Sequence, residues 1–129
     1  MPSTDPAERM SSLLRTKQRT DGLATTVLGV IGEIDMTTAG DLGTAIAAAL
    51  VEQPGRLILD LSAVTFLASA GLNVLVTANN EAAMPVGIVA SGPAVVRALE
   101  VTGLDGVLAV YSTLAEALSS TRESAPPER

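Results

Sequence analysis

The residue best placed for chemistry is Ser69, in the run of small side chains Ala68-Ser69-Ala70-Gly71. The run follows an apolar strand and a turn and starts a predicted helix, so the N–H groups of the first helical turn stay approachable. Ser69 can cap this helix, because Ser is a preferred N-cap residue. It can also accept a phosphoryl group, since the helix dipole and free N–H groups tolerate a phosphate there. The two roles are compatible, and both place Ser69 at the helix start.

Few other side chains suit catalysis. The 129 residues contain no His, no Cys and no Trp, and the single lysine, Lys17, lies near the N-terminus. The commonest general base and metal ligand is therefore missing, as are thiolate catalysis and Cys-type zinc sites. Ser69 has no conventional base, and no glycine-rich nucleotide-binding pattern occurs. The sequence predicts a protein that is not an enzyme, with no catalytic residues, no metal site and no cofactor.

Charge is distributed unevenly along the chain. The formal net charge is −6, and between residues 23 and 118 only Arg56 and Arg97 are basic, against nine acidic residues. A domain with so few cations lacks the footprint that binding to a phosphate backbone requires. We expect no direct contact with nucleic acid.

The hydropathy of the sequence argues against a membrane-spanning segment and a secretory signal. No segment reaches the ~20 consecutive apolar residues of a membrane span, and the first 20 residues lack the apolar run of a secretory signal. The expected location is the cytoplasm.

Strands and helices alternate around Ser69. A segment rich in β-branched residues spans 24–31, with a short edge strand over 13–19 paired to it across Thr20-Asp21-Gly22. Further strands are predicted over 57–61, 86–90 and 107–111. The apolar run at 57–61 is typical of a central strand covered on both faces, and a turn is expected between it and Ser69.

Helices fill the intervals. Leu42, Ile46, Ala49 and Leu50 form an apolar stripe after an N-cap at Thr37 or Thr38. A second helix starts near Ser69, and a third has Pro93 in its first turn and Gly103 as its C-terminal cap. A short helix over 114–118 closes the series. This alternation predicts one α/β domain over 13–118, with flexible segments at 1–12 and 119–129.

Three landmarks, in order and at the expected spacing, make the chain resemble the bacterial STAS-domain anti-sigma factor antagonists. The first is Gly32-Glu33-Ile34-Asp35 followed by Thr38-Ala39. The second is the strand 57–66. The third is Ser69-Ala70-Gly71-Leu72, with 95–99 and 102–104 in the helix that follows. The resemblance covers roughly 13–118 and implies a STAS-like fold, a mixed sheet of about four to five strands with about four helices packed mainly on one face.

The resemblance also implies a mechanism. Antagonists of this family bind an anti-sigma factor that is a serine kinase of the histidine-kinase-like ATPase fold, and so release a sigma factor. The kinase phosphorylates a serine at the start of the second helix, which ends the interaction. A metal-dependent Ser/Thr phosphatase reverses the modification. Ser69 matches the phosphoacceptor and Asp35 the acidic residue beside it.

The expected partner surface combines these landmarks with a polar stripe. Ser69, Asn73, Thr77 and Asn80 recur at helical spacing, opposite Leu72, Leu75, Val76 and Asn79. Most such stripes are solvated faces, but uncharged Asn and Thr on an acidic domain suggest a partner contact more than Lys or Glu would. The predicted partner-binding residues are Glu33, Asp35, Thr37, Thr38, Ala68, Ser69, Gly71, Leu72, Asn73, Thr77 and Asn80.

One departure from the family pattern keeps a second hypothesis open. Ala68 stands where the family usually has an Asp. The leading hypothesis is a phosphorylation-switched antagonist, and the second is a STAS interaction module that binds its partner without that switch. A carrier of a small nucleotide or lipid ranks third, because the core lacks aromatic platforms and a cationic cluster. The expected state is a monomer or weak dimer.

Overall fold

The structure, a computed structural model, describes residues 14–21 and 25–120. The strands are β1 (Leu14–Asp21), β2 (Thr25–Ile34), β3 (Arg56–Leu67), β4 (Val86–Val89) and β5 (Ala109–Tyr111). The helices are α2 (Ala39–Val51), α3 (Ser69–Glu81), α4 (Pro93–Thr102) and α5 (Leu114–Ser119), with a 3-10 turn η1 (Leu104–Gly106) before β5. Three parts of the sequence-based prediction lie outside the described residues: the N-terminal segment 1–12, the turn residue Gly22, and residues 121–129 of the C-terminal tail. Ser119, placed in that tail by the sequence, ends α5.

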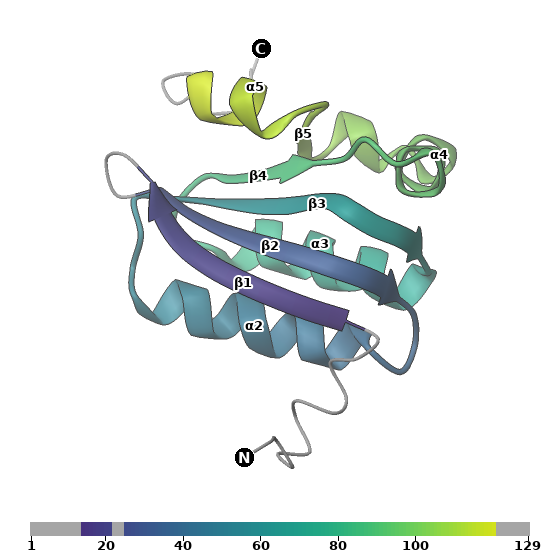
Figure 1. Cartoon of the computed structure of the whole chain (residues 1–129), viewed down its shortest axis with the longest axis horizontal. Helices are drawn as coiled ribbons and strands as arrows, with labels where there is room; N and C mark the ends of the chain where they lie inside the picture. Colours follow the sequence, from purple (N-terminus) through teal and green to yellow (C-terminus); the bar gives the residue numbers. More distant parts are fainter. Residues whose placement is uncertain (1–13, 22–24, 121–129) are drawn as a thin grey trace.

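The five described strands form one mixed sheet in the order β1-β2-β3-β4-β5 (Figure 1). β1 runs antiparallel to β2, and the other neighbours are parallel. The α/β class, the number of strands and the edge strand before β2 are therefore confirmed. Because the carboxyl ends of β2 and β3 lie at one edge, the segments that follow them start side by side.

Side chains of the sheet alternate between two cores of unequal size. Leu57, Leu59 and Leu61 of β3 are buried in the larger core, to which α2, α3 and α4 contribute. Ile58 points to the other face, where a smaller core contains Ala117 of α5. Burial on both faces explains the continuous apolar run of β3. It also confirms that the helices of the described chain pack mainly on one face.

The central strands are longer than predicted. β3 continues to Leu67, so the turn expected after Leu61 is wrong. Two register shifts interrupt the pairing of β2 with β3. The second falls between the buried residues Val64 and Leu67, which are three apart instead of two. The irregular spacing hides the strand from a period-2 search.

Gly32 permits the extension of β2. Its φ of 118° is a conformation that side chains rarely adopt, and it lies at the second register shift. β2 thus reaches Ile34 instead of ending at Ile31. The later predictions hold: Pro93 begins α4, and Gly103, in the left-handed region, caps its end.

Candidate functional site

The site forms where the carboxyl ends of β2 and β3 meet. The amide of Ala68, the residue after β3, donates a hydrogen bond of 2.8 Å to the carbonyl of Ile34, the last residue of β2. Ile34 is completely buried and precedes Asp35, while Ala68 precedes Ser69. The bond therefore places the turn after β2 next to the start of α3, as the sequence predicted for Asp35 and Ser69.

Asp35 organises the turn between β2 and α2. Its Oδ1 accepts hydrogen bonds from the amides of Thr37 (2.9 Å) and Thr38 (3.0 Å) and from the Thr38 hydroxyl (3.1 Å). The Thr38 hydroxyl accepts from the Asp35 amide and lies 2.7 Å from the carbonyl of Glu33. Thr38 is the N-cap of α2, but its side chain does not cap the helix. Its hydroxyl instead closes the turn, an arrangement common for Asp and Thr in loops.

These hydrogen bonds hold negative charge at the site. The Thr38 amide, with smaller contributions from the Thr38 hydroxyl and the Thr37 amide, holds the pKa of Asp35 below its ordinary value of 3.8, although desolvation opposes the shift. Glu33, two residues earlier, is exposed. The edge of the site is therefore anionic at neutral pH.

Ser69 is the first residue of α3 and is exposed. The N-cap is Ala68, in an extended conformation with φ −89° and ψ 172°, and no side chain caps the helix. The prediction that Ser69 caps the helix is wrong, because Ala68, held by its hydrogen bond to Ile34, is the N-cap and the helix begins one residue earlier than a cap at Ser69 would require. Gly71 and Leu72 donate to the Ala68 carbonyl, and among the described residues no acceptor is recorded for the amides of Ser69 and Ala70.

Gly71 lets α3 approach β2 closely. A Cβ at this position would lie 2.6 Å from Leu67 Cδ1 and would also collide with the side chain of Ile34. Neither neighbour can move easily, because both are buried. The glycine in the predicted landmark is therefore explained by packing beneath Ser69.

The polar stripe of α3 faces outward as predicted. Ser69, Asn73, Thr77 and Asn80 are exposed, whereas Leu72 and Leu75 are buried. The stripe starts at Ser69 and follows the length of the helix. It provides a continuous uncharged surface next to the anionic turn.

The predicted contact residues fall into three groups by exposure. Those with exposed side chains are Glu33, Thr37, Ser69, Asn73, Thr77 and Asn80, while Asp35 and Ala68 are half-buried. Thr38, Gly71 and Leu72 are buried and so support the site instead of presenting side chains to a partner.

Two exposed apolar residues near the site were missed. Met36, in the turn after Asp35, is 82% exposed, and Phe66, near the end of β3, is 47% exposed. Phe66 pairs with Glu33 across the strands, which places an apolar side chain beside an acidic one. A large apolar residue in a polar turn, or just before the small residues that start α3, is a sequence signal that could have identified them, because exposed large hydrophobic residues often mark contact sites.

The arrangement has the features of a protein-recognition surface. The described part of the chain contains no group of three potential metal ligands close together. None of its helices combines the length and apolar character needed to cross a membrane. The site presents a hydroxyl at a helix start, an anionic turn and exposed apolar side chains, which together suit recognition of another protein.

Comparisons with known proteins agree with this description. The family model of the STAS domain matches residues 15–117. The anti-sigma-F factor antagonist RsfB of Mycobacterium tuberculosis is 40% identical over 98 residues, which cover 74% of this chain and 80% of that protein.

Solved structures are similar over most of the chain. An anti-sigma factor antagonist from Mycobacterium paratuberculosis aligns with a TM-score of 0.78 at 39% identity, covering 84% of this chain and 94% of the other. Bacillus SpoIIAA in its phosphorylated form aligns with a TM-score of 0.62 at 17% identity, covering 83% and 99% of the two chains. At that identity the second likeness concerns the fold alone.

Proposed function

The chain belongs to the STAS domain family, and from that premise we propose that it is an anti-sigma factor antagonist. It binds an anti-sigma factor in the cytoplasm through the surface around Ser69 and thereby releases a sigma factor. Its relatives in both mycobacterial species are named as antagonists of anti-sigma factors, which supports this assignment.

Phosphorylation of Ser69 is the proposed switch. The anti-sigma factor, a serine kinase of the histidine-kinase-like ATPase fold, transfers the γ-phosphoryl group of ATP to the Ser69 hydroxyl and releases ADP and a proton. The phosphate adds about −1.5 to −2 charges at pH 7 beside an edge that is already anionic. The bulk of the phosphate and the cost of desolvating its charge at the interface then end the contact. A metal-dependent Ser/Thr phosphatase restores it by hydrolysis.

One observation carries the proposal. Ser69 is exposed in the first turn of α3, where its own amide and that of Ala70 have no acceptor among the described residues. A kinase can reach the hydroxyl, and the free amides can accommodate the phosphate without unfolding the helix. The same position lies one residue from the hydrogen bond that joins the two halves of the surface.

The N-cap of α3 favours a second candidate function. Ala68 places no carboxylate next to the acceptor, and no side chain caps the helix. If kinase recognition depends on that carboxylate, the chain is a STAS interaction module that binds its partner without a phosphorylation switch.

A phosphorylation assay separates the two candidates. The full chain is incubated with each purified anti-sigma factor of the source bacterium and Mg-ATP, and the phosphate is mapped by mass spectrometry. Modification at Ser69 that disappears in Ser69→Ala supports the switch. Stable binding without any modification, and with unchanged affinity of Ser69→Asp, supports the second candidate.

A further inference from the structure

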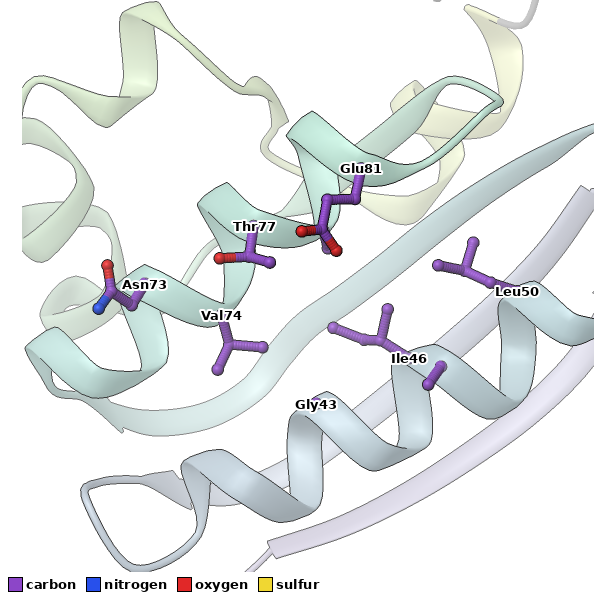
Figure 2. Close-up of a pocket in the computed structure, with 9 residues that line it drawn as sticks. Gly43, Ile46, Leu50, Asn73, Val74, Thr77 and Glu81 are labelled. Atoms are coloured by element: carbon purple, nitrogen blue, oxygen red, sulfur yellow. The ribbon is translucent and has the colours of Figure 1, made fainter.

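An apolar groove of about 270 Å³ lies between α2 and α3. Figure 2 shows Ile46 and Leu50 of α2 and Val74 of α3 turned toward the space between the helices. Ile46 is buried, and the other two side chains are half-buried. The groove is open to solvent, so its apolar walls are available to a partner.

Small residues keep the groove open. Gly43 has no side chain, and a Cβ there would only just reach Val74, at 4.0 Å from its Cγ1. Ala47 on α2 and Ala78 on α3 also line the groove and add one methyl group each. A larger side chain at any of these positions would fill space that the fold leaves empty.

The groove continues the surface around Ser69. Asn73 and Thr77 belong to the polar stripe that starts at Ser69, and both also line the groove. Figure 2 places them along α3 above the apolar walls. A partner bound at Ser69 that extends along α3 therefore meets the groove directly.

Charge selects among possible occupants. Neither α2 nor α3 contains a Lys or Arg, whereas Asp41 and Glu81 are acidic and Glu52 follows α2. A second copy of the chain docked through this face would bring acidic groups together, which is unfavourable. A partner with basic residues would be attracted, and Glu81 lies at the groove itself.

We propose that the groove binds an amphipathic helix of the anti-sigma factor, with its apolar ridge between α2 and α3 and a basic residue beside Glu81. The space between two packed helices matches the ridge of a third, as in other helix-in-groove interactions. This inference rests on the proposed function, because it names a second contact region for the same partner. The groove supplies affinity by burying apolar surface, while Ser69 supplies the switch.

A matched pair of substitutions on α2 tests the groove. Ala47 and its neighbour Ala48 are both exposed, but only Ala47 lines the groove. Titration calorimetry of the full chain with each purified anti-sigma factor of the source bacterium measures the affinity. We expect Ala47→Leu to weaken binding about tenfold or more, because its side chain occupies the groove, and Ala48→Leu to leave the affinity unchanged. Thermal unfolding verifies that both variants keep the fold.

The charge of Glu81 gives a second, independent readout. Glu81→Gln should weaken binding and reduce the dependence of affinity on salt, whereas Glu52→Gln, whose side chain does not line the groove, should do neither. Equal salt dependence for Glu81→Gln and the wild-type chain would overturn the assignment of a basic group beside Glu81.

The outcomes distinguish the groove from the proposed function. If Ser69→Asp loses affinity but Ala47→Leu binds like the wild-type chain, the groove proposal is wrong and the proposed function stands. If no anti-sigma factor binds the wild-type chain, both are wrong. If Ala47→Leu alters only self-association in analytical ultracentrifugation, the occupant is a second copy, and the proposal is overturned in favour of a dimer.

Discussion

The amide of Ala68 donates a hydrogen bond of 2.8 Å to the carbonyl of Ile34 and so joins two segments that are far apart in the sequence. Ile34 precedes the turn held by Asp35, and Ala68 precedes Ser69. Because Ile34 and Leu67, the residue before Ala68, are both buried in the larger core, the turn and the helix start cannot move independently. The surface around Ser69 is therefore a preformed unit, and its parts can be tested one at a time.

Gly71→Ala should destabilise the fold by about 1–3 kcal/mol, because the added methyl group collides with Leu67 and Ile34. Gly40→Ala is the control, since it lies in the first turn of α2 and a Cβ there meets nothing within 4 Å. That change should be neutral or stabilise by up to about 1 kcal/mol. Urea unfolding measures both, and equal stability of the two variants would contradict the close packing beneath Ser69.

Ala68→Asp should stabilise α3 by roughly 0.5–2 kcal/mol, because an Asp at the N-cap can accept from the free amides of the first turn. Ala68→Asn provides a cap without a charge and should stabilise to a similar extent. If neither variant raises the midpoint of thermal unfolding, the assignment of Ala68 as an uncapped N-cap is wrong. Faster phosphorylation of Ala68→Asp alone would show that the kinase recognises the carboxylate.

Asp35→Asn should change how stability depends on pH. The pKa of Asp35 is lower in the folded chain than its ordinary value of 3.8, so folding favours the ionised carboxylate. Its stabilisation is complete above that ordinary value and is lost as the pH falls through the lower value of the folded state. The free energy of unfolding of the wild-type chain should therefore decline more steeply in this acidic range than that of Asp35→Asn.

Urea unfolding at a series of pH values from 7 to below 3.8 measures this difference. The exposed Glu52→Gln serves as the control substitution and should follow the wild-type curve. Parallel curves for Asp35→Asn and the wild-type chain would show that the hydrogen bonds from Thr37 and Thr38 do not favour the charged carboxylate.

Met36→Ser and Phe66→Ser should weaken binding to the anti-sigma factor, because exposed apolar side chains beside a polar site often contribute most of an interface's affinity. We expect a loss of about tenfold for the pair combined. Val101→Ser removes a similarly exposed apolar residue on α4, 72% exposed, and should leave the affinity unchanged. If Val101→Ser weakens binding as much as Met36→Ser and Phe66→Ser do, Met36 and Phe66 make no specific contact with the partner.

The sequence predicts those features of the fold that depend on a single residue or on the spacing within one helix. Pro93 and Gly103 mark the ends of α4 by their own backbone preferences, and the stripe from Ser69 follows from helical spacing. The apolar pattern alone, which ends at Leu61, could not predict the end of β3, because that end depends on pairing of Glu33 with Phe66 and of Ile34 with Leu67. Those pairs are set by the register between two strands distant in the chain. The family landmark 57–66 came within one residue of it.

The same distinction holds for the site. The sequence predicts Ser69 and Asp35 as site residues from their type and position in a family pattern, but the N-cap at Ala68 follows from where β3 ends. The hydrogen-bonding role of Thr38 depends on how the chain turns after Ile34. The groove depends on how closely α2 and α3 approach, and no single-helix pattern encodes that distance.

The measurement that tests the central claim most directly is the affinity of the anti-sigma factor for the wild-type chain, Ser69→Ala and Ser69→Asp, determined by titration calorimetry. Wild-type and Ser69→Ala should bind alike, since the unmodified hydroxyl is small and exposed. Ser69→Asp should retain the fold yet bind at least about tenfold more weakly, because it adds charge beside the anionic turn. Equal affinity of Ser69→Asp and the wild-type chain would contradict a switch at Ser69.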